Sequence, residues 1–492
     1  MGNQSLKHQT VSGLAWKMSE RIGTQFVRMT TMIILARILM PEDYGAIALV
    51  TVFVSICDVI LVNGLSSPLI QKKNADAVDF STIFYCSVTI SIFLYGIIYL
   101  SAPAISEFYE MEILSPVLRV LGIGVIVSAI SSVQNAYVSR NMQFRTFFFA
   151  TIIGLVFSGI LGIAMAYQGC GIWALVGQTL SNQVVNMIVV FLFIRWYPQN
   201  LFSLKRLKDM WSFGWRIFMA AFINQLFTDL RTILIGKFYT KQELAFYNQG
   251  NSYPHMIVDN VNSSINSVLF PAIAKIQDDI PAVKNFLRRS IKTGSFFMFP
   301  CILAFAAMAE PLVRLVLTEK WLPSVPFIQV ICLSLCLAPI STPSQQAIKA
   351  IGRSDITMKQ ELIKKSVFLL IIIISVFISV WAVVIGTAIG ELWCIIVNTY
   401  PNKKLLDYSI GQQIKDILPN GLCALIMATI IYLINFLHLP LFLCIISQIF
   451  TGIIVYWAIC AVSNNESYVY CKSNIEIQLG RWFKKANKKL AD

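Results

Sequence analysis

Charged and amide side chains recur at helical spacing inside stretches that are otherwise apolar. Near residue 27, Arg21, Gln25 and Arg28 follow one another at steps of four and three, which places them on one face of a helix. A similar group lies about two hundred residues later in the chain: Asn224, Gln225, Thr228, Asp229 and Arg231. Guanidinium groups bind phosphate through paired hydrogen bonds, and amides bind sugar hydroxyls. These stripes therefore predict a site for an anionic, hydroxyl-rich ligand.

Two amide pairs match each other across the chain in the same way. They stand in "SSVQNA" from Ser131 and in "TPSQQA" from Thr342. The predicted substrate contacts are Gln25, Arg28, Gln134, Asn135, Asn224, Gln225, Arg231, Gln345 and Gln346. Carboxylates inside membrane spans often mark ion pathways. The candidates for binding a coupling proton or Na⁺ are Asp58, Asp229 and Asp259.

Each of these polar residues also has a purely structural interpretation. Arg21 and Arg216 lie near helix ends, from which their charge can extend to the membrane surface. Asp229 and Arg231 can neutralise each other or a group on a neighbouring helix, and a single amide often hydrogen-bonds two helices together. The concentration of such residues at matching places in the two halves favours a cavity.

The elements that must position these residues are membrane helices. Of 492 residues, 57% are hydrophobic and only 13% are charged, which is outside the range of a soluble multidomain protein. Apolar stretches of about 20 residues recur, as a helix needs to cross a bilayer, and the short alternating segments of a membrane β-barrel are missing. We predict an all-α polytopic membrane protein with about fourteen spans. Their centres lie near residues 27, 57, 93, 126, 157, 184, 225, 258, 301, 336, 370, 391, 426 and 451.

The net charge of +14 follows the membrane topology. Lysines and arginines cluster at the N-terminus, in alternate loops and in the C-terminal tail, whereas the opposite loops are short and often acidic, as at Glu42 and Asp43. By the positive-inside rule, both termini are predicted to lie in the cytoplasm. The tail over residues 465–492 is basic and amphipathic and is predicted to lie on anionic membrane lipids. No nucleic-acid partner is needed to explain the charge.

The chain contains an internal repeat. "VNGLSSPLIQKKNAD" from Val62 resembles "INSVLFPAIAKIQDD" from Ile265, and weaker matches precede and follow this pair. Six predicted spans separate the copies, so both copies enter the membrane from the same side and an axis along the membrane normal relates the halves. The predicted organisation is a six-helix bundle over residues 1–200, a second bundle over 201–405, two additional membrane helices over 406–464 and the tail over 465–492.

No motif predicts an enzyme or a cofactor. A G-x-x-x-x-G-K-[ST] loop for nucleotide binding is absent from the sequence. The three histidines, His8, His255 and His438, have no paired spacing for zinc. Two repeated halves that rock against each other would instead give alternating access to a central site. The sequence therefore predicts a transporter.

Particular motifs add a family resemblance. "LARILMPEDYG" at the end of the first span, "VLFPAIAKIQDD", the "EKW" of Glu319 to Trp321 and the doubled six-helix plan resemble Wzx-type polysaccharide flippases. Within the multidrug, oligosaccharidyl-lipid and polysaccharide exporter superfamily, the likeness is to the branch with colanic acid and teichuronic acid exporters. It covers the chain through about residue 400.

The resemblance implies a cargo and a setting. The cargo would be an oligosaccharide repeat unit on undecaprenyl diphosphate, moved from the inner to the outer leaflet of the bacterial cytoplasmic membrane. A V-shaped pair of bundles would surround a cationic cavity, and a polysaccharide polymerase and other export machinery would be partners. An inside-negative potential favours outward movement of each negative charge by about 2.3 kcal/mol per 100 mV.

Three alternatives remain open from the sequence. A cation-coupled drug antiporter of the same superfamily would share the fold but should concentrate unpaired acidic groups in its cavity. A membrane-bound glycosyltransferase or polymerase should carry a long external loop or a catalytic cluster. A structural or regulatory membrane protein would keep the fold without transporting anything.

Overall fold

The computed structural model is helical, as the sequence predicts. It describes residue 20 and residues 23–72, 75–141, 143–194, 196–437 and 439–473. Throughout these ranges every regular element is a helix, and there are no strands. Arg21 and most of the predicted amphipathic tail lie outside the described residues.

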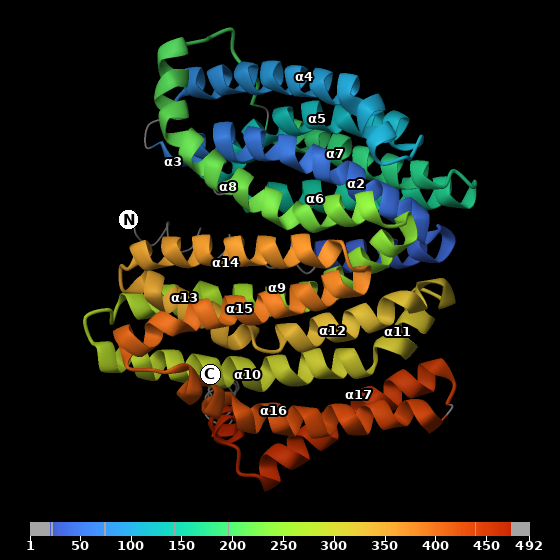
Figure 1. The fold of residues 1–492 in the computed structure, drawn as a ribbon. Coiled ribbons are helices and arrows are strands. Elements are labelled where there is room, and N and C mark those ends of the chain that lie inside the picture. Colours follow the sequence, from blue (N-terminus) through green and yellow to red (C-terminus); the bar gives the residue numbers. More distant parts are fainter. Residues whose placement is uncertain are drawn as a thin grey trace, which may run out of the picture. The chain divides into compact units, whose positions relative to one another are not determined.

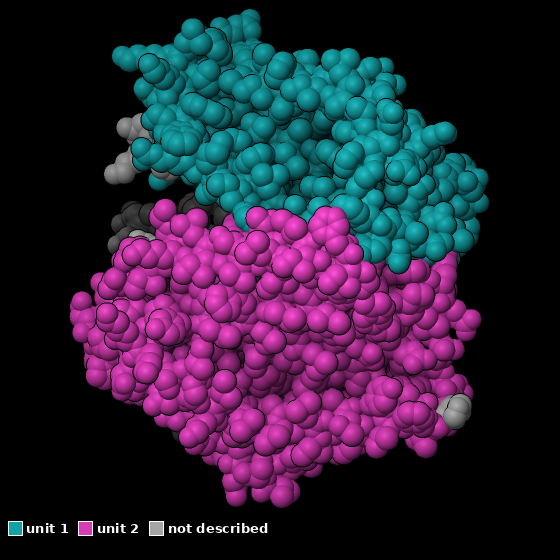
Figure 2. Space-filling view, viewed as in Figure 1, with its two compact units in different colours: residues 1–245 teal, residues 246–492 magenta. Residues whose placement is uncertain are grey.

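The helices form two compact units, which Figure 2 colours separately. Unit 1 comprises residues 1–245 and unit 2 comprises residues 246–492. The repeat in the sequence predicts a division at residue 200, before α8 (Leu204–Phe238), whereas α8 packs against α2 (Pro41–Val59) inside unit 1. The predicted boundary at residue 200 marks the start of the second copy of the sequence repeat, and it stays a prediction.

Unit 1 is a bundle in which α2 contacts α5 and α8, α4 packs on α5, and α6 packs on α7 (Figure 1). The helix over residues 23–38 contributes Leu35 to a buried cluster that also contains Ala166 and Leu175. Besides that helix, α2 and α8, the elements are η1 (Ile60–Ser66), α3 (Ser67–Gln71), α4 (Ala77–Phe108), α5 (Leu114–Arg140), α6 (Phe144–Tyr167) and α7 (Ile172–Ile194).

Unit 2 is a second bundle, in which α10 packs on α16, α14 packs on α15, and α12 and α13 contact α15 (Figure 1). Its first helix, α9 (Lys241–Ala274), begins at the end of unit 1. The elements that follow are α10 (Ile280–Ala307), α11 (Ala309–Val316), η2 (Glu319–Ser324), α12 (Val325–Leu335), α13 (Ala338–Ala350), α14 (Ser354–Val376), α15 (Val380–Leu406), α16 (Ile410–Leu433), η3 (Ile434–Leu437), α17 (Leu441–Val462) and a helix over residues 466–473.

The multi-pass membrane character is confirmed, but the predicted count of fourteen spans is not. Among the described residues, ten helices are long and apolar enough to cross a membrane. The pair Glu319–Leu335 and Ala338–Ala350, bent by 43°, would make an eleventh span. Neither α9 nor α14 reaches this standard, because both carry many polar residues. Helices of this kind in a membrane protein place polar groups at membrane depth, where they need partners or a cavity.

The two copies of the repeated sequence form similar corners. Each copy ends in an aspartate that caps the next helix: Asp76 accepts a hydrogen bond from the amide of Asp79, and Asp279 accepts one from the amide of Ala282 at 3.0 Å. The caps satisfy amide groups that the first turn of a helix leaves without partners. Because such caps are local, the same residues produce the same corner in both halves of the chain.

The first corner is also held by ion pairs. Asp79 is fully buried, and both of its oxygens lie 2.7 Å from the Lys72 ammonium. Arg206 of α8 adds a contact at 3.3 Å to Asp79 and a second contact to Asp76. The hydrogen bond from Arg206 lowers the pKa of Asp76. These contacts attach the start of α8 to the corner between α3 and α4.

Candidate functional site

A carboxylate, an amide and a hydroxyl connect α2 to α8 in unit 1. Ser55 donates a hydrogen bond of 2.9 Å to Asp229 Oδ2, and Gln225 donates one of 2.8 Å to the same oxygen. Gln225 also lies 3.3 Å from the Ser55 hydroxyl. The structure thus brings two predicted site residues together with a third, Ser55, which the sequence analysis does not single out. These bonds join two helices, so Gln225 and Asp229 have a structural role in this conformation.

Gln134 behaves differently from Gln225. Its side chain is fully buried in α5, and neither its oxygen nor its nitrogen has a hydrogen-bond partner among the described residues. The side-chain oxygen of the adjacent Asn135 is likewise buried without a partner there. An amide that joins helices would be hydrogen-bonded, whereas these atoms remain available to water or to a ligand.

A second pair of buried amides faces α5 and α6 from α7. The side-chain oxygens of Asn182 and Gln183 have no partner in the described part of the chain. Gly124 of α5 and Gly154 of α6 make room for them, since a β-carbon would lie 2.4 Å from the Gln183 oxygen and 2.9 Å from the Asn182 oxygen. Within its described residues, unit 1 therefore contains four side-chain amides with buried atoms that lack a partner. We call Gln134, Asn135, Asn182 and Gln183 the amide seam.

The two arginines that are predicted to contact the substrate both belong to unit 1. Arg28 is exposed on the helix over residues 23–38, and Arg231 is half-buried on α8. On the same helices, Gln25 is half-buried and Asn224 is exposed. Both helices therefore carry cationic and amide groups outside the tightly packed interior, and their role in binding stays a prediction.

The remaining predicted carboxylates have contrasting surroundings. Asp58 of α2 is hydrogen-bonded to Ser128 of α5, but its Oδ1 atom is buried without a partner in the described residues. Asp259 is exposed on α9 in unit 2. Of the three candidate ion-coupling residues, Asp58 alone presents a buried carboxylate oxygen of this kind within the described ranges.

In unit 2, the first amide of the predicted pair joins two helices. Gln345 of α13 donates a hydrogen bond of 2.8 Å to Glu361 of α14, which also accepts one of 2.7 Å from Lys364. Lys364 is almost fully buried, so this ion pair reduces the cost of placing its charge inside the unit. Gln346, the next residue in the sequence after Gln345, is half-buried.

Besides Asn262, which shares a polar helix face with Asp259, α9 carries polar groups that sequence reasoning did not single out. The hydroxyls of Tyr247 and Tyr253 and the side-chain oxygens of Gln249, Asn251 and Asn262 are all buried without a partner among the described residues. A signal for them was present in the sequence, because α9 is too polar for an apolar span.

Both units thus hold buried hydrogen-bonding groups that have no partner among the residues that the structure describes, in helices of a membrane protein. Such groups cost free energy in a dry interior, and they are usually satisfied by water or by a polar ligand. Amides and hydroxyls match the donors and acceptors of sugars, and the arginines of unit 1 match phosphate. The described residues hold no cluster of three metal-ligating side chains.

Comparison with known proteins gives a family match and several relatives. The model of the family described as "Polysaccharide biosynthesis protein" matches residues 34–326. The lipopolysaccharide biosynthesis protein WzxC of Escherichia coli (strain K12) is 24% identical over 406 residues, which cover 80% of either chain. The teichuronic acid biosynthesis protein TuaB of Bacillus subtilis (strain 168) is 24% identical over 354 residues, covering 72% of this chain and 73% of TuaB.

Among solved structures, the fold is similar to that of a lipid II flippase. An inward closed conformation of the flippase MurJ superposes with a TM-score of 0.75 at 16% sequence identity. The superposition covers 92% of this chain and 99% of MurJ. At this identity, the likeness establishes the fold alone.

Proposed function

We propose that this chain, a Wzx-type flippase that belongs to the polysaccharide biosynthesis protein family, moves oligosaccharide repeat units on undecaprenyl diphosphate across the bacterial cytoplasmic membrane. The family match and the relatives named for lipopolysaccharide and teichuronic acid biosynthesis support a lipid-linked oligosaccharide as cargo. They favour this function over a drug antiporter. The proposed direction is from the inner to the outer leaflet, with both termini in the cytoplasm.

The strongest support from this chain for a sugar-containing cargo is the amide seam. Its buried oxygens and the Gln134 nitrogen lack partners among the described residues, so a hydroxyl-rich ligand or water can satisfy them. Sugar recognition uses neutral donors and acceptors of this kind. We propose that the seam and α9 contact sugars, and that Arg28 and Arg231 contact the diphosphate.

Alternating access is the proposed mechanism. The repeated corners at Asp76 and Asp279 give each half of the sequence a similar turn next to its second helix. The diphosphate is negatively charged, so an inside-negative potential favours its outward movement. Asp58 remains the proposed site for a coupling proton or Na⁺, because its buried Oδ1 is available. A polysaccharide polymerase that consumes the flipped unit is a proposed partner.

Deletion of the gene in the native host tests the function. We expect undecaprenyl diphosphate carrying a complete oligosaccharide to accumulate on the inner leaflet while surface polysaccharide disappears. Mass spectrometry of extracted lipids measures the first change, and labelling of intact cells measures the second. Unchanged lipid-linked sugar together with altered sensitivity to cationic drugs would support the antiporter instead.

Replacement of both arginines tests the proposed diphosphate contacts. A charge-assisted hydrogen bond contributes about 1.5–3 kcal/mol, so Arg28→Ala with Arg231→Ala should lower export by about 100-fold or more. Export is measured as the rate at which surface polysaccharide returns when the variant gene is induced in the deletion strain. The matched control replaces Arg314 and Arg353, which pair with exposed carboxylates.

The control should restore export fully, with equal amounts of both proteins in the membrane. If the Arg28 and Arg231 double variant restores export as well as the control does, these arginines do not bind the cargo. That result would leave the flippase function intact, because the deletion experiment tests it separately.

A further inference from the structure

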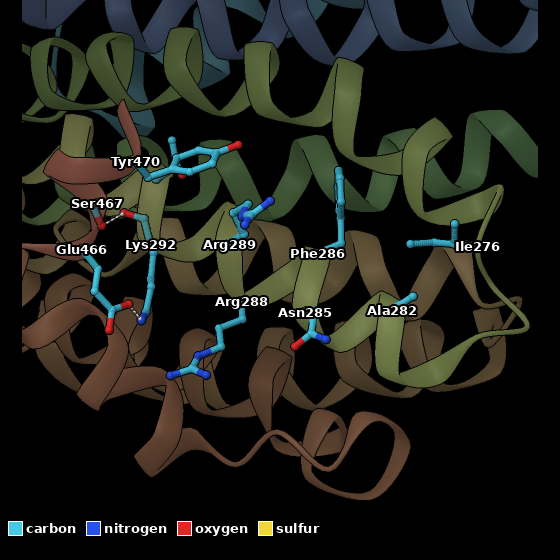
Figure 3. A pocket seen from close by; sticks show the side chains of 11 residues that line it. Ile276, Ala282, Asn285, Phe286, Arg288, Arg289, Lys292, Glu466, Ser467 and Tyr470 are labelled. Carbon is cyan, nitrogen blue, oxygen red and sulfur yellow. Dashed lines mark hydrogen bonds and ion pairs between the residues drawn. The ribbon is translucent and has the colours of Figure 1, made fainter. Parts of the chain in front are cut away.

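Two adjoining cavities lie in unit 2 between α10 and the helix over residues 466–473. Their volumes are about 740 and 700 Å³. Both are lined by Phe286, Arg289, Thr293 and Tyr470, so the two spaces meet at these side chains. Figure 3 shows the first cavity, with the side chains of Arg289 and Tyr470 next to each other.

The first cavity is cationic, but two of its three cations are neutralised. Arg288 forms two hydrogen bonds of 2.7 Å with Asp416, and Lys292 lies 3.2 Å from the same carboxylate. Lys292 also contacts Glu466 at 2.5 Å, as Figure 3 shows. Both side chains are therefore committed to carboxylates within unit 2.

Arg289 is in a different situation. Its guanidinium carbon lies 4.6 Å from the centre of the Tyr470 ring, and it forms no ion pair within the described ranges. Stacking on an aromatic face orients a guanidinium and leaves its hydrogen-bond donors available at the edge. Arg289 is thus an oriented cation without a carboxylate partner in the described part of the chain.

The second cavity is largely apolar. Beyond the shared residues, its apolar lining comes from Val261 and Leu269 of α9 and from Gly294 and Phe297 of α10, and Asn260 and Ser290 add two polar side chains. Leu269 is buried, whereas 53% of the Phe297 side chain is exposed. One end of the joined space is therefore lined by a cation, Arg289, and the other end is lined mainly by apolar side chains.

We propose that the two cavities bind one anionic phospholipid of the surrounding membrane, with its phosphate at Arg289 and an acyl chain along Phe297. Arginine matches phosphate geometry with paired hydrogen bonds, and basic pockets between membrane helices bind lipid headgroups. An amphiphile fits a cation joined to an apolar cavity better than a free anion does. The residues that line it are not the proposed transport contacts, although α9 contributes to both, and the proposal rests on the membrane location of the chain.

Lipid binding by the purified full-length protein tests the site. Native mass spectrometry in a neutral detergent measures the population that retains phosphatidylglycerol, with phosphatidylcholine as the neutral probe. Loss of a charge-assisted contact should weaken phosphatidylglycerol binding about tenfold in Arg289→Gln. Arg289→Lys should recover part of the binding, because it restores the charge but not the planar fork.

Arg314→Gln is the matched control, since it removes an arginine of unit 2 that already pairs with Glu310 and Glu319. It should bind phosphatidylglycerol as the parent does, and phosphatidylcholine binding should be equally weak in all variants. Thermal unfolding of each variant shows whether a loss of binding comes from a loss of folding.

Three results would overturn the proposal. The first is equal phosphatidylglycerol binding by Arg289→Gln and the parent. The second is displacement of phosphatidylglycerol by inorganic phosphate at comparable concentration, which would indicate a site for the free anion. The third is stronger retention of undecaprenyl phosphate than of phosphatidylglycerol, which would assign the cavities to the carrier lipid of the transported substrate.

Discussion

Asp416→Ala should destabilise unit 2 by about 1–3 kcal/mol, the cost of removing a buried carboxylate and leaving its hydrogen-bond donors without that partner. The Asp416 side chain is 7% exposed and accepts hydrogen bonds from Arg288, from Lys292 and, at 2.8 Å, from the hydroxyl of Tyr408. These contacts join α10 to α16. Denaturant unfolding of the purified protein in detergent, followed by the fluorescence of its tryptophans, measures the change.

The control for this substitution is a carboxylate with similar geometry and different exposure. Asp355 forms two hydrogen bonds of 2.9 Å with Arg353, but its side chain is 54% exposed. Asp355→Ala should leave stability almost unchanged, because water screens an exposed ion pair. Equal effects of the two substitutions would show that burial does not set the strength of the Asp416 cluster.

Gly214→Ala should destabilise unit 1 by about 2 kcal/mol through steric overlap. A β-carbon at Gly214 of α8 would lie 2.1 Å from the carbonyl oxygen of Gly64 in η1 and 3.0 Å from Pro68. The first obstacle is backbone, so α8 has to move away from α2 and η1. Unfolding of the variant in detergent measures the loss, and export in the deletion strain shows whether the displaced helix still functions.

Gly64 supplies the matched control on the other side of the same contact. A β-carbon there would lie 3.4 Å from both Phe218 and Trp211, which is ordinary van der Waals contact. Gly64→Ala should therefore be neutral or slightly stabilising, since alanine has the better helix propensity. If Gly214→Ala is as stable as Gly64→Ala, the close approach of the two backbones does not hold α8 in place.

The helical membrane fold was predictable from the sequence, because hydrocarbon tolerates only backbones that satisfy their own hydrogen bonds. Runs of apolar residues therefore identify helices without any knowledge of their neighbours. The corners at Asp76 and Asp279 were equally readable, since a cap depends on residues three positions away. The predicted count of fourteen spans is not confirmed, because polar helices such as α9 do not meet the length and composition standard of a membrane span.

The sequence by itself determined where polar side chains sit along their helices, and only the tertiary structure decided which of them have partners. Gln225 and Gln345 are both amides in membrane helices, as is Gln134, yet the first two are bonded across helices and the third has no partner in the described residues. Periodicity gives the face of a helix that a residue occupies, but the neighbour on that face comes from distant sequence. Arg288, for example, pairs with Asp416, which lies 128 positions away in the chain, so no local pattern predicts the pair. The adjacent Arg289 lies over the ring of Tyr470 instead.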